Sequence, residues 1–156
     1  MEFLSGGCMG FTNLEPVIMV VDDDPDVLEI LRLKIQMLVP LEVVTEDSAL
    51  NALETLKTRD IPLVITDINM PHMNGVMLLE AVKALEKGIQ VIVMSAGTST
   101  INCIDCLRHG AADFLVKPFQ NDVLLDVLRG NLERFERWRQ FFGSRWSDSN
   151  SGKKGS

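Results

Sequence analysis

The residues best suited to chemistry are a group of carboxylates, one hydroxyl and one lysine, spread widely along the chain. They are Asp22-Asp23-Asp24, Asp67, Ser95 and Lys117. Crowded carboxylates repel one another, and a divalent cation relieves that repulsion. Ligation by oxygen alone, with room for several waters, is typical of Mg²⁺. A carboxylate nucleophile, a metal, a lysine and a hydroxyl are together suited to phosphoryl transfer, which requires a positioned nucleophile and balanced charge on the phosphoryl oxygens.

Short apolar segments alternate with amphipathic segments, and the candidate residues follow the apolar ones. Nearly continuous apolar runs predict five strands, over 17–21, 41–45, 63–66, 90–94 and 113–116. Apolar residues three or four positions apart predict five helices, over 25–38, 48–57, 76–85, 98–108 and 121–142. The strand over 41–45 is the more polar one, which is typical of a sheet edge. The residues expected on one face of the second helix are Leu50, Leu53 and Leu56.

Regular alternation of strands and helices indicates a parallel sheet with right-handed crossovers and helices on both faces. We therefore expect an α/β fold with a five-stranded, doubly wound parallel sheet in the flavodoxin-like order 2-1-3-4-5. Ligands in such folds bind beyond the carboxyl ends of the strands. Because the predicted strands end beside them, the side chains that should converge on one rim are Asp22, Asp23, Asp67, Ser95 and Lys117.

Four motifs, each at the end of a predicted strand, resemble those of response-regulator receiver domains in bacterial two-component signalling, the CheY-like superfamily. They are Val20-Val21-Asp22-Asp23-Asp24-Pro25-Asp26, Asp67-Ile68-Asn69-Met70-Pro71-His72-Met73-Asn74-Gly75, Met94-Ser95-Ala96 and Lys117-Pro118-Phe119. The resemblance covers about residues 16–133. It implies a phosphorylation-dependent signalling switch, which catalyses its own phosphorylation and dephosphorylation, rather than a metabolic enzyme.

The resemblance also implies a role for the matching residues around the metal. Asp67 is implied as the phosphoryl acceptor and as a metal-facing carboxylate. Asp23 is implied as the direct Mg²⁺ ligand, with Asp22 beside it acting mostly through water. The backbone carbonyl of Asn69 is the implied third protein oxygen on the metal.

Three further positions match the part of the family that responds to the phosphoryl group. Ser95 is implied to move toward the phosphoryl group, while Phe114 swings inward as an aromatic switch. Lys117 is implied to pair with the phosphoryl oxygens, and the Lys117–Pro118 bond is implied to be cis. The phosphoryl donor would be a histidine kinase or a histidine phosphotransfer protein.

Two other function classes share some of these residues. A phosphatase similar to the haloacid dehalogenases would carry an aspartyl nucleophile after the first strand. Asp22-Asp23-Asp24 lacks that family's Asp-x-Asp-x-Thr pattern, and the chain leaves no room for a cap domain. A pseudo-receiver would act only as a binding surface, and the joint presence of the acids, the hydroxyl and the lysine disfavours it.

The amino-acid composition limits the class of protein and the cellular compartment that the chain fits. The 46% hydrophobic fraction is ample for a packed core, and the net charge of -7 disfavours nonspecific nucleic-acid binding by the whole chain. No apolar run approaches the length of a membrane span. The three cysteines, Cys8, Cys103 and Cys106, do not suggest a disulfide framework, so we expect a reducing, cytoplasmic setting.

The pattern divides the chain into four segments. We expect a disordered leader over 1–15, the receiver domain over 16–133, a helical extension over 134–146 and a disordered tail over 147–156. The extension is rich in arginine and aromatic residues, and the domain has no obvious core left to bury them. We interpret it as a linker to an output domain or as a homodimer surface. The face near the fourth and fifth strands is the other candidate dimer surface.

Overall fold

The computed structural model describes residues 15–96 and 100–151, so most of the predicted leader and the end of the tail lie outside the described residues. The strands are β1 (Ile18–Val21), β2 (Val43–Glu46), β3 (Leu63–Asp67), β4 (Gln90–Ala96) and β5 (Asp113–Lys117). The helices are α1 (Pro25–Leu38), α2 (Ala49–Thr58), α3 (Gly75–Ala84), α4 (Thr100–Arg108) and α5 (Asn121–Ser151). The ten predicted elements are therefore all present, in the predicted order.

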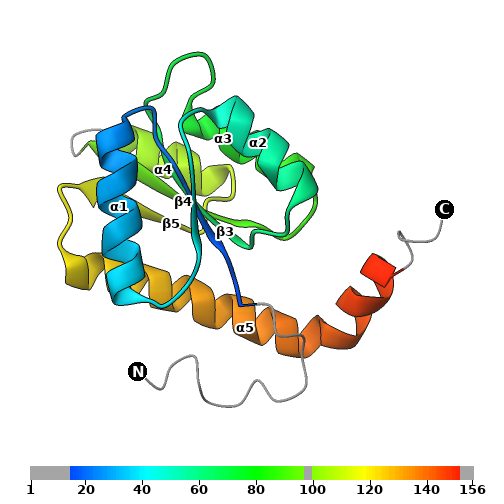
Figure 1. The fold of residues 1–156 in the computed structure, drawn as a ribbon. Coiled ribbons are helices and arrows are strands. Elements are labelled where there is room, and N and C mark those ends of the chain that lie inside the picture. Colours follow the sequence, from blue (N-terminus) through cyan, green and yellow to red (C-terminus); the bar gives the residue numbers. More distant parts are fainter. Residues whose placement is uncertain (1–14, 97–99, 152–156) are drawn as a thin grey trace.

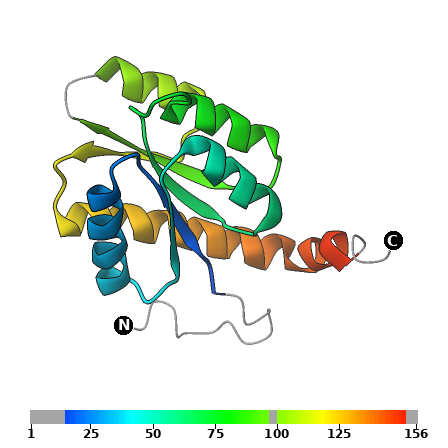
Figure 2. The same cartoon turned by 45° about the horizontal axis from the view of Figure 1, so that its top comes forward.

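The five strands form one parallel sheet in the order β2-β1-β3-β4-β5, which confirms the predicted topology. Helices α1 and α5 cover one face of the sheet, while α2, α3 and α4 cover the other (Figures 1 and 2). The more polar strand β2 lies at an edge, as predicted, and β5 forms the opposite edge. The carboxyl ends of β1, β3, β4 and β5 therefore meet along one rim of the sheet.

Alternate residues of each central strand enter two separate cores, because successive side chains of a strand point to opposite faces. In β1, Ile18 and Val20 pack against α1 and α5, whereas Met19 and Val21 pack against α2 and α3. All four residues of β1 are fully buried. The sheet is consequently held rigid from both sides, and its rim is a stable platform for the residues that follow the strands.

Local sequence determines where α1 begins, immediately after the acidic run. Asp24 caps this helix, since its Oδ1 accepts a hydrogen bond from the Asp26 backbone N–H at 2.9 Å, and Pro25 occupies the first turn. The observed bounds of α1 equal the predicted ones. The cap fixes the chain direction directly after β1, which orients Asp22 and Asp23 at the rim.

The predicted buried face of α2 is wrong at one position. Leu50 is 55% exposed, while the buried residues of this helix are Ala49, Ala52 and Leu56. Hydrophobic spacing alone favoured the leucines. The residues of α2 that enter the core beside Leu56 are instead the two alanines, so the buried face of this helix is rotated away from Leu50.

The last helix is longer than predicted. It continues without interruption to Ser151, whereas the sequence pattern placed its end near Phe142 and a disordered tail from Ser147. Residues 147–151 are therefore helical, and residues 152–156 lie outside the described part. Figure 1 shows that the last turns of α5 run past the sheet, away from the other helices.

Candidate functional site

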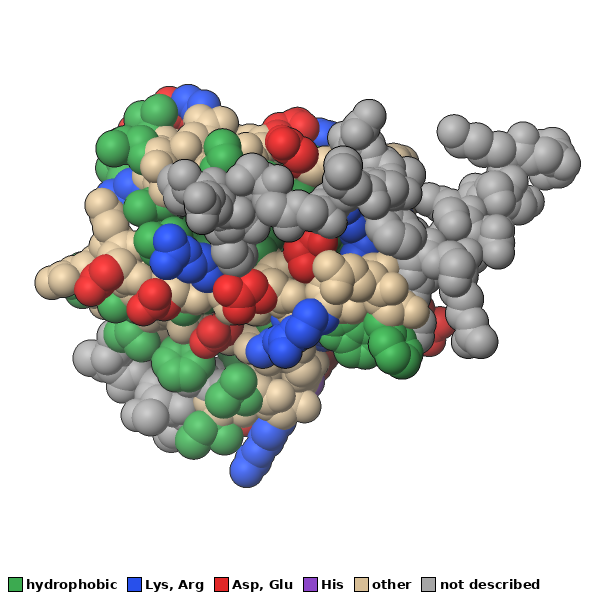
Figure 3. Space-filling model, turned by 90° about the horizontal axis from the view of Figure 1, so that it is seen from below, with side chains coloured by type: hydrophobic (Ala, Val, Ile, Leu, Met, Phe, Trp, Pro, Cys, Tyr) green, Lys and Arg blue, Asp and Glu red, His purple; other side chains and the backbone are tan. Residues whose placement is uncertain are grey.

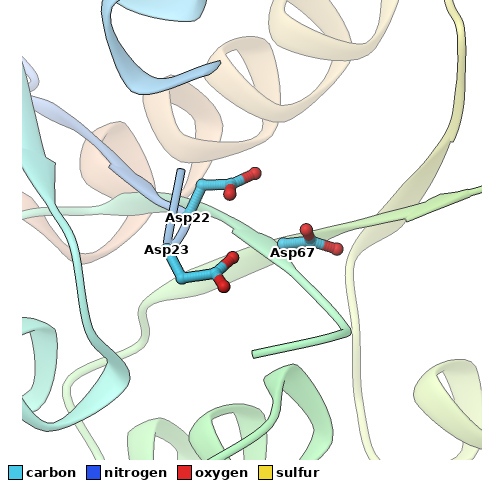
Figure 4. A group of neighbouring side chains, drawn as sticks. All are labelled: Asp22, Asp23 and Asp67. Atoms are coloured by element: carbon cyan, nitrogen blue, oxygen red, sulfur yellow. The ribbon is translucent and has the colours of Figure 1, made fainter. Parts of the chain in front are cut away.

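Three carboxylates stand together at the carboxyl ends of β1 and β3. One oxygen each of Asp22, Asp23 and Asp67 lies within 4.8 Å of the others. In Figure 4 the carboxylates of Asp22 and Asp23 point toward Asp67. Two like charges at this separation repel by about 3–4 kcal/mol at an effective dielectric constant of about 20. The group therefore favours a cation, and an all-oxygen donor set fits Mg²⁺.

Asp22 is the buried member of the group, with 2% of its surface exposed. Its Oδ1 accepts a hydrogen bond from the Asp24 backbone N–H at 3.0 Å, and its Oδ2 lies 3.2 Å from Lys117 Nζ. Both oxygens thus have protein partners. Asp23 is exposed, and its carboxylate makes no hydrogen bond or ion pair within the described part of the chain. The two adjacent acids consequently differ in what they can offer a ligand.

Lys117 joins the ends of three strands. Its Nζ lies 3.2 Å from Asp22 Oδ2 and 3.3 Å from Asp67 Oδ2, so one cation bridges β1, β3 and β5. The Lys117–Pro118 peptide bond is cis, as the resemblance implied. A lysine held in this way carries one positive charge among three carboxylates, which leaves the group with net negative charge.

Asp67 is held from several sides at the end of β3. Its Oδ1 accepts a hydrogen bond from the Asn69 backbone N–H at 3.2 Å, and its Oδ2 faces Lys117. Its backbone carbonyl accepts a hydrogen bond from the Thr66 hydroxyl at 3.0 Å. The carboxylate is only partly buried, so it is oriented by the fold and still reachable from outside.

Gly75 fixes the return of the loop that follows Asp67. A Cβ on Gly75 would collide with the Asp67 carbonyl oxygen and would lie 2.8 Å from the Ile68 Cα, both of them backbone atoms. The Gly75 N–H also donates to the Ile68 carbonyl at 2.9 Å. Sequence reasoning interpreted this glycine only as turn punctuation. The signal it missed is a glycine at the first position of a helix directly after a candidate nucleophile loop.

The two predicted switch residues lie on adjacent strands. Ser95 is near the end of β4 and is 3% exposed, and its register partner on β5 is Val116. Phe114, two residues earlier on β5, is 38% exposed and its ring is thus directed outward. Residues 97–99 follow β4 and lie outside the described part of the chain. The structure therefore brings Ser95 to the rim, with Phe114 on the neighbouring edge strand.

The pKa of Lys117 gives a prediction about stability in alkali. Burial lowers this pKa. The negative charges of Asp67 and Asp22, together with hydrogen bonds to both, raise it by more, so the pKa of Lys117 lies above the ordinary lysine value. A raised pKa contributes stability that is complete below the unfolded-state pKa of about 10.4 and is lost as pH rises through the folded-state pKa. We expect the excess unfolding free energy of wild type over Lys117→Met to be constant near neutral pH and to shrink above about pH 10.4. Urea titrations from neutral to strongly alkaline pH measure it, and a difference that grows in alkali would contradict the pairing.

A sequence profile described as the response regulator receiver domain matches residues 18–129, which is most of the chain. The chain belongs to this family. The match includes the three carboxylates, Ser95 and Lys117. Membership excludes the haloacid-dehalogenase alternative, and it makes the chain a signalling domain of two-component systems rather than a metabolic enzyme.

Curated relatives agree with this assignment. The chain is 31% identical over 128 residues to the transcriptional regulatory protein GlrR of Escherichia coli, covering 79% of the chain and 29% of that protein. It is 41% identical over 113 residues to the two-component response regulator ARR11 of Arabidopsis thaliana, covering 71% of the chain and 21% of that protein. The receiver thus spans less than a third of the length of these relatives.

Solved receiver structures resemble this receiver along nearly their whole length. A receiver domain protein from Clostridium thermocellum has a TM-score of 0.74 and 25% identity, covering 80% of this chain and 99% of that one. A response regulator receiver protein from Pseudomonas putida has a TM-score of 0.70 and 30% identity, covering 76% and 99%. The part of this chain left over in both comparisons is additional to a complete receiver.

The length and apolar character of the helices can be compared with those of a membrane span. Within the described residues, no helix combines the length and the apolar character needed to cross a bilayer.

Proposed function

We propose that this receiver accepts a phosphoryl group on Asp67 and works as a phosphorylation-dependent switch. The observation that supports this most is the position of the Asp67 carboxylate. It lies between Lys117 Nζ at 3.3 Å and the Asn69 N–H at 3.2 Å, beside two further acids. A carboxylate oriented by fixed donors and partly open to solvent is suited to act as a nucleophile.

The donor is a phosphohistidine on a histidine kinase or histidine phosphotransfer protein. A carboxylate oxygen of Asp67 attacks the phosphorus, a P–O bond forms, and the P–N bond breaks with its electron pair going to the imidazole nitrogen. Lys117 is already within reach of that carboxylate and can hold the phosphoryl oxygens as a point charge. Hydrolysis of the acyl phosphate by water returns the free carboxylate, which resets the switch.

We propose that the acid group holds Mg²⁺ during this reaction. When bound, the ion balances charge on the phosphoryl oxygens. Asp23 suits direct ligation because it is exposed and makes no other polar contact within the described residues. Asp22 is engaged by Lys117 and by the Asp24 N–H, which suits an indirect role through water. Asp67 and the backbone carbonyl of Asn69 complete the proposed set.

The response to phosphorylation is proposed to pass through Ser95 and Phe114. Ser95 is the last residue but one of β4, at the rim, and its hydroxyl can donate a hydrogen bond to a phosphoryl oxygen. Phe114 lies on β5 with its ring outward, so an inward movement would change the surface near β4 and β5. This gives the switch two states whose balance the phosphoryl group shifts, and that surface can report the state to a partner or to an output domain.

One experiment tests the acceptor, the metal and the switch together. Incubation with acetyl phosphate and Mg²⁺ is expected to add the mass of one phosphoryl group, and a chelator in excess over Mg²⁺ is expected to prevent it. Beryllofluoride with Mg²⁺, a phosphoryl mimic, is expected to shift the ring resonances of Phe114 in the wild type and far less in Ser95→Ala. Mass spectrometry and NMR spectroscopy give the two readouts.

The outcomes separate the parts of the proposal. No mass gain under any condition would leave a pseudo-receiver, which acts by binding alone. A mass gain that persists with the chelator would contradict the metal role. A mass gain with unchanged Phe114 resonances would keep the acceptor and exclude the switch route.

A further inference from the structure

The loop between β3 and α3, residues 68–74, carries two methionines that belong to the core and also border a cavity. These loop methionines, Met70 and Met73, are partly buried and pack against the apolar cluster beneath α2 and α3. Together with Leu50 and His72 they line a cavity of about 50 Å³, which is enough for at least one molecule the size of water. A small solute can therefore reach side chains that also hold the loop in place.

The loop is a closed turn beside the proposed phosphoryl acceptor. The Gly75 N–H donates to the Ile68 carbonyl at 2.9 Å, which joins the two ends of the turn. His72 within the turn has a φ of 68°, in the left-handed region that residues other than glycine seldom adopt. A backbone of this kind persists only where surrounding contacts hold it. The packing of the loop methionines, which lie on either side of His72 along the chain, supplies such contacts.

Each loop methionine is bonded to a residue that orients the site. Met70 follows Asn69, whose N–H donates to Asp67 Oδ1 at 3.2 Å and whose carbonyl belongs to the proposed Mg²⁺ set. Met73 precedes Asn74, whose side chain caps α3. A displacement of either methionine side chain from the core therefore acts on these residues through a single peptide bond.

We propose that Met70 and Met73 are a modification site, at which oxidation to methionine sulfoxide by hydrogen peroxide lowers the reactivity of Asp67. The thioether sulfur attacks one peroxide oxygen, so an S–O bond forms and the O–O bond breaks. The departing hydroxide takes the proton of the transferred oxygen and leaves as water. Sulfur loses two electrons and peroxide gains them. The inference rests on the proposed function, because it names a regulator of that same site.

Oxidation changes what the loop methionines can pack against. It converts a flexible apolar side chain into a polar one. A sulfoxide oxygen that stayed among apolar core residues such as Ala49 would lack hydrogen bonds, which is unfavourable for a buried polar group. We therefore expect the oxidised side chains to turn toward solvent and the loop to move with them. That movement takes the Asn69 N–H and carbonyl away from Asp67 and the proposed metal.

The other methionines of the described part differ in exposure or in surroundings. Met19 and Met94 are fully buried in the sheet, so peroxide cannot reach them in the folded protein. Met37 on α1 is 80% exposed and Met77 on α3 is 46% exposed, so both should be oxidised first. Apolar side chains also reach the surface on the side that carries α5 (Figure 3), and exposure alone therefore does not mark a site. The loop methionines combine partial exposure with core packing beside the acceptor.

Two paired variants separate the loop methionines from the exposed ones. The loop variant, Met70→Leu with Met73→Leu, keeps the exposed methionines. The surface variant, Met37→Leu with Met77→Leu, keeps the loop methionines. Leucine nearly conserves the volume of methionine, so both untreated variants should fold and gain the phosphoryl mass like wild type. All three proteins keep the three cysteines, so any effect of cysteine oxidation is common to them.

The experiment treats each protein with hydrogen peroxide, at a concentration that leaves Met19 and Met94 unoxidised, and then with dithiothreitol to reduce cysteine disulfides. Peptide mapping by mass spectrometry locates each sulfoxide. We expect the rate of mass gain from acetyl phosphate to fall about 10–100-fold in wild type and in the surface variant, the usual range when groups that orient metal ligands are altered. The loop variant should keep its untreated rate. Methionine sulfoxide reductases with dithiothreitol should restore the wild type.

A second readout does not require phosphorylation. The backbone amide resonances of residues 68–75 should shift on oxidation in wild type and in the surface variant, but not in the loop variant. If untreated wild type gains no phosphoryl mass, the proposed function fails, and these resonances still decide whether oxidation displaces the loop. Three results would overturn the inference: loop methionines that stay reduced while Met37 is fully oxidised, a loop variant that peroxide inactivates as strongly as wild type, and oxidised loop methionines with unchanged resonances.

Discussion

Asp67→Asn is expected to abolish the phosphoryl mass gain from acetyl phosphate while leaving the protein folded. An amide is not a carboxylate nucleophile and cannot form an acyl phosphate, although it has nearly the same shape. The substitution removes the ion pair with Lys117 at 3.3 Å, but it also removes the repulsion from Asp22 and Asp23. These changes oppose each other, so we expect a change in unfolding free energy of less than about 1 kcal/mol. Intact mass spectrometry and urea unfolding measure the two quantities.

Asp24→Asn is the matched control for this experiment. It makes the same chemical change on the same rim, but Asp24 caps α1 through the Asp26 N–H and asparagine caps helices equally well. Phosphorylation and stability should both stay close to wild type. If Asp67→Asn still gained the mass of a phosphoryl group while Asp24→Asn did not, the acceptor would be Asp24 and not Asp67.

Gly75→Ala is expected to destabilise the receiver by about 1–3 kcal/mol, the usual range for overpacking, and to slow phosphorylation. The added Cβ would collide with the Asp67 carbonyl oxygen, and backbone atoms cannot rotate away as a flexible side chain can. Either the loop from Asp67 to Gly75 opens or the end of β3 moves. Both displace the carboxylate from Lys117, so stability and reactivity should fall together.

Gly130→Ala provides the opposite expectation for the same substitution. Gly130 lies inside α5, and a Cβ there would meet nothing within 4 Å. Alanine is the better helix former, so we expect a gain of about 0.5–1 kcal/mol and unchanged phosphorylation. Urea unfolding and acetyl phosphate labelling of both variants check these outcomes. Equal effects of the two substitutions would mean that the contact at Gly75 does not constrain the site.

Much of the fold could be predicted because its signals are local. The burial of β1 on both faces appears in the sequence as a continuous apolar run, and Asp24 with Pro25 sets the start of α1 within a single turn. Since parallel strands present their carboxyl ends on one side, the topology also predicted that Asp23, Asp67 and Lys117 would share a rim.

The buried face of α2 and the end of α5 differ from their predictions, and both depend on more than local sequence. Leu50 has the spacing of a buried residue, yet the orientation of α2 on the core buries Ala49 and Ala52 instead. Helix α5 contains no proline after Asn121 and runs through Gly143 to Ser151, whereas the polar composition near Ser147 was interpreted as a tail. Helix orientation and helix length depend on neighbours that a sequence window does not contain.

The sequence by itself determined the type of this protein: five strands and five helices in order, with acids, a hydroxyl and a lysine at strand ends. Only the tertiary structure decided which of the adjacent acids is buried and paired and which is exposed. Asp22 is buried and engaged by Lys117, while its neighbour Asp23 is exposed. Asp22 and Lys117 are 95 residues apart, and the close approach of Gly75 to the Asp67 carbonyl spans a folded loop. Contacts of this kind depend on the relative placement of strands and loops in space, which residue type and spacing leave open.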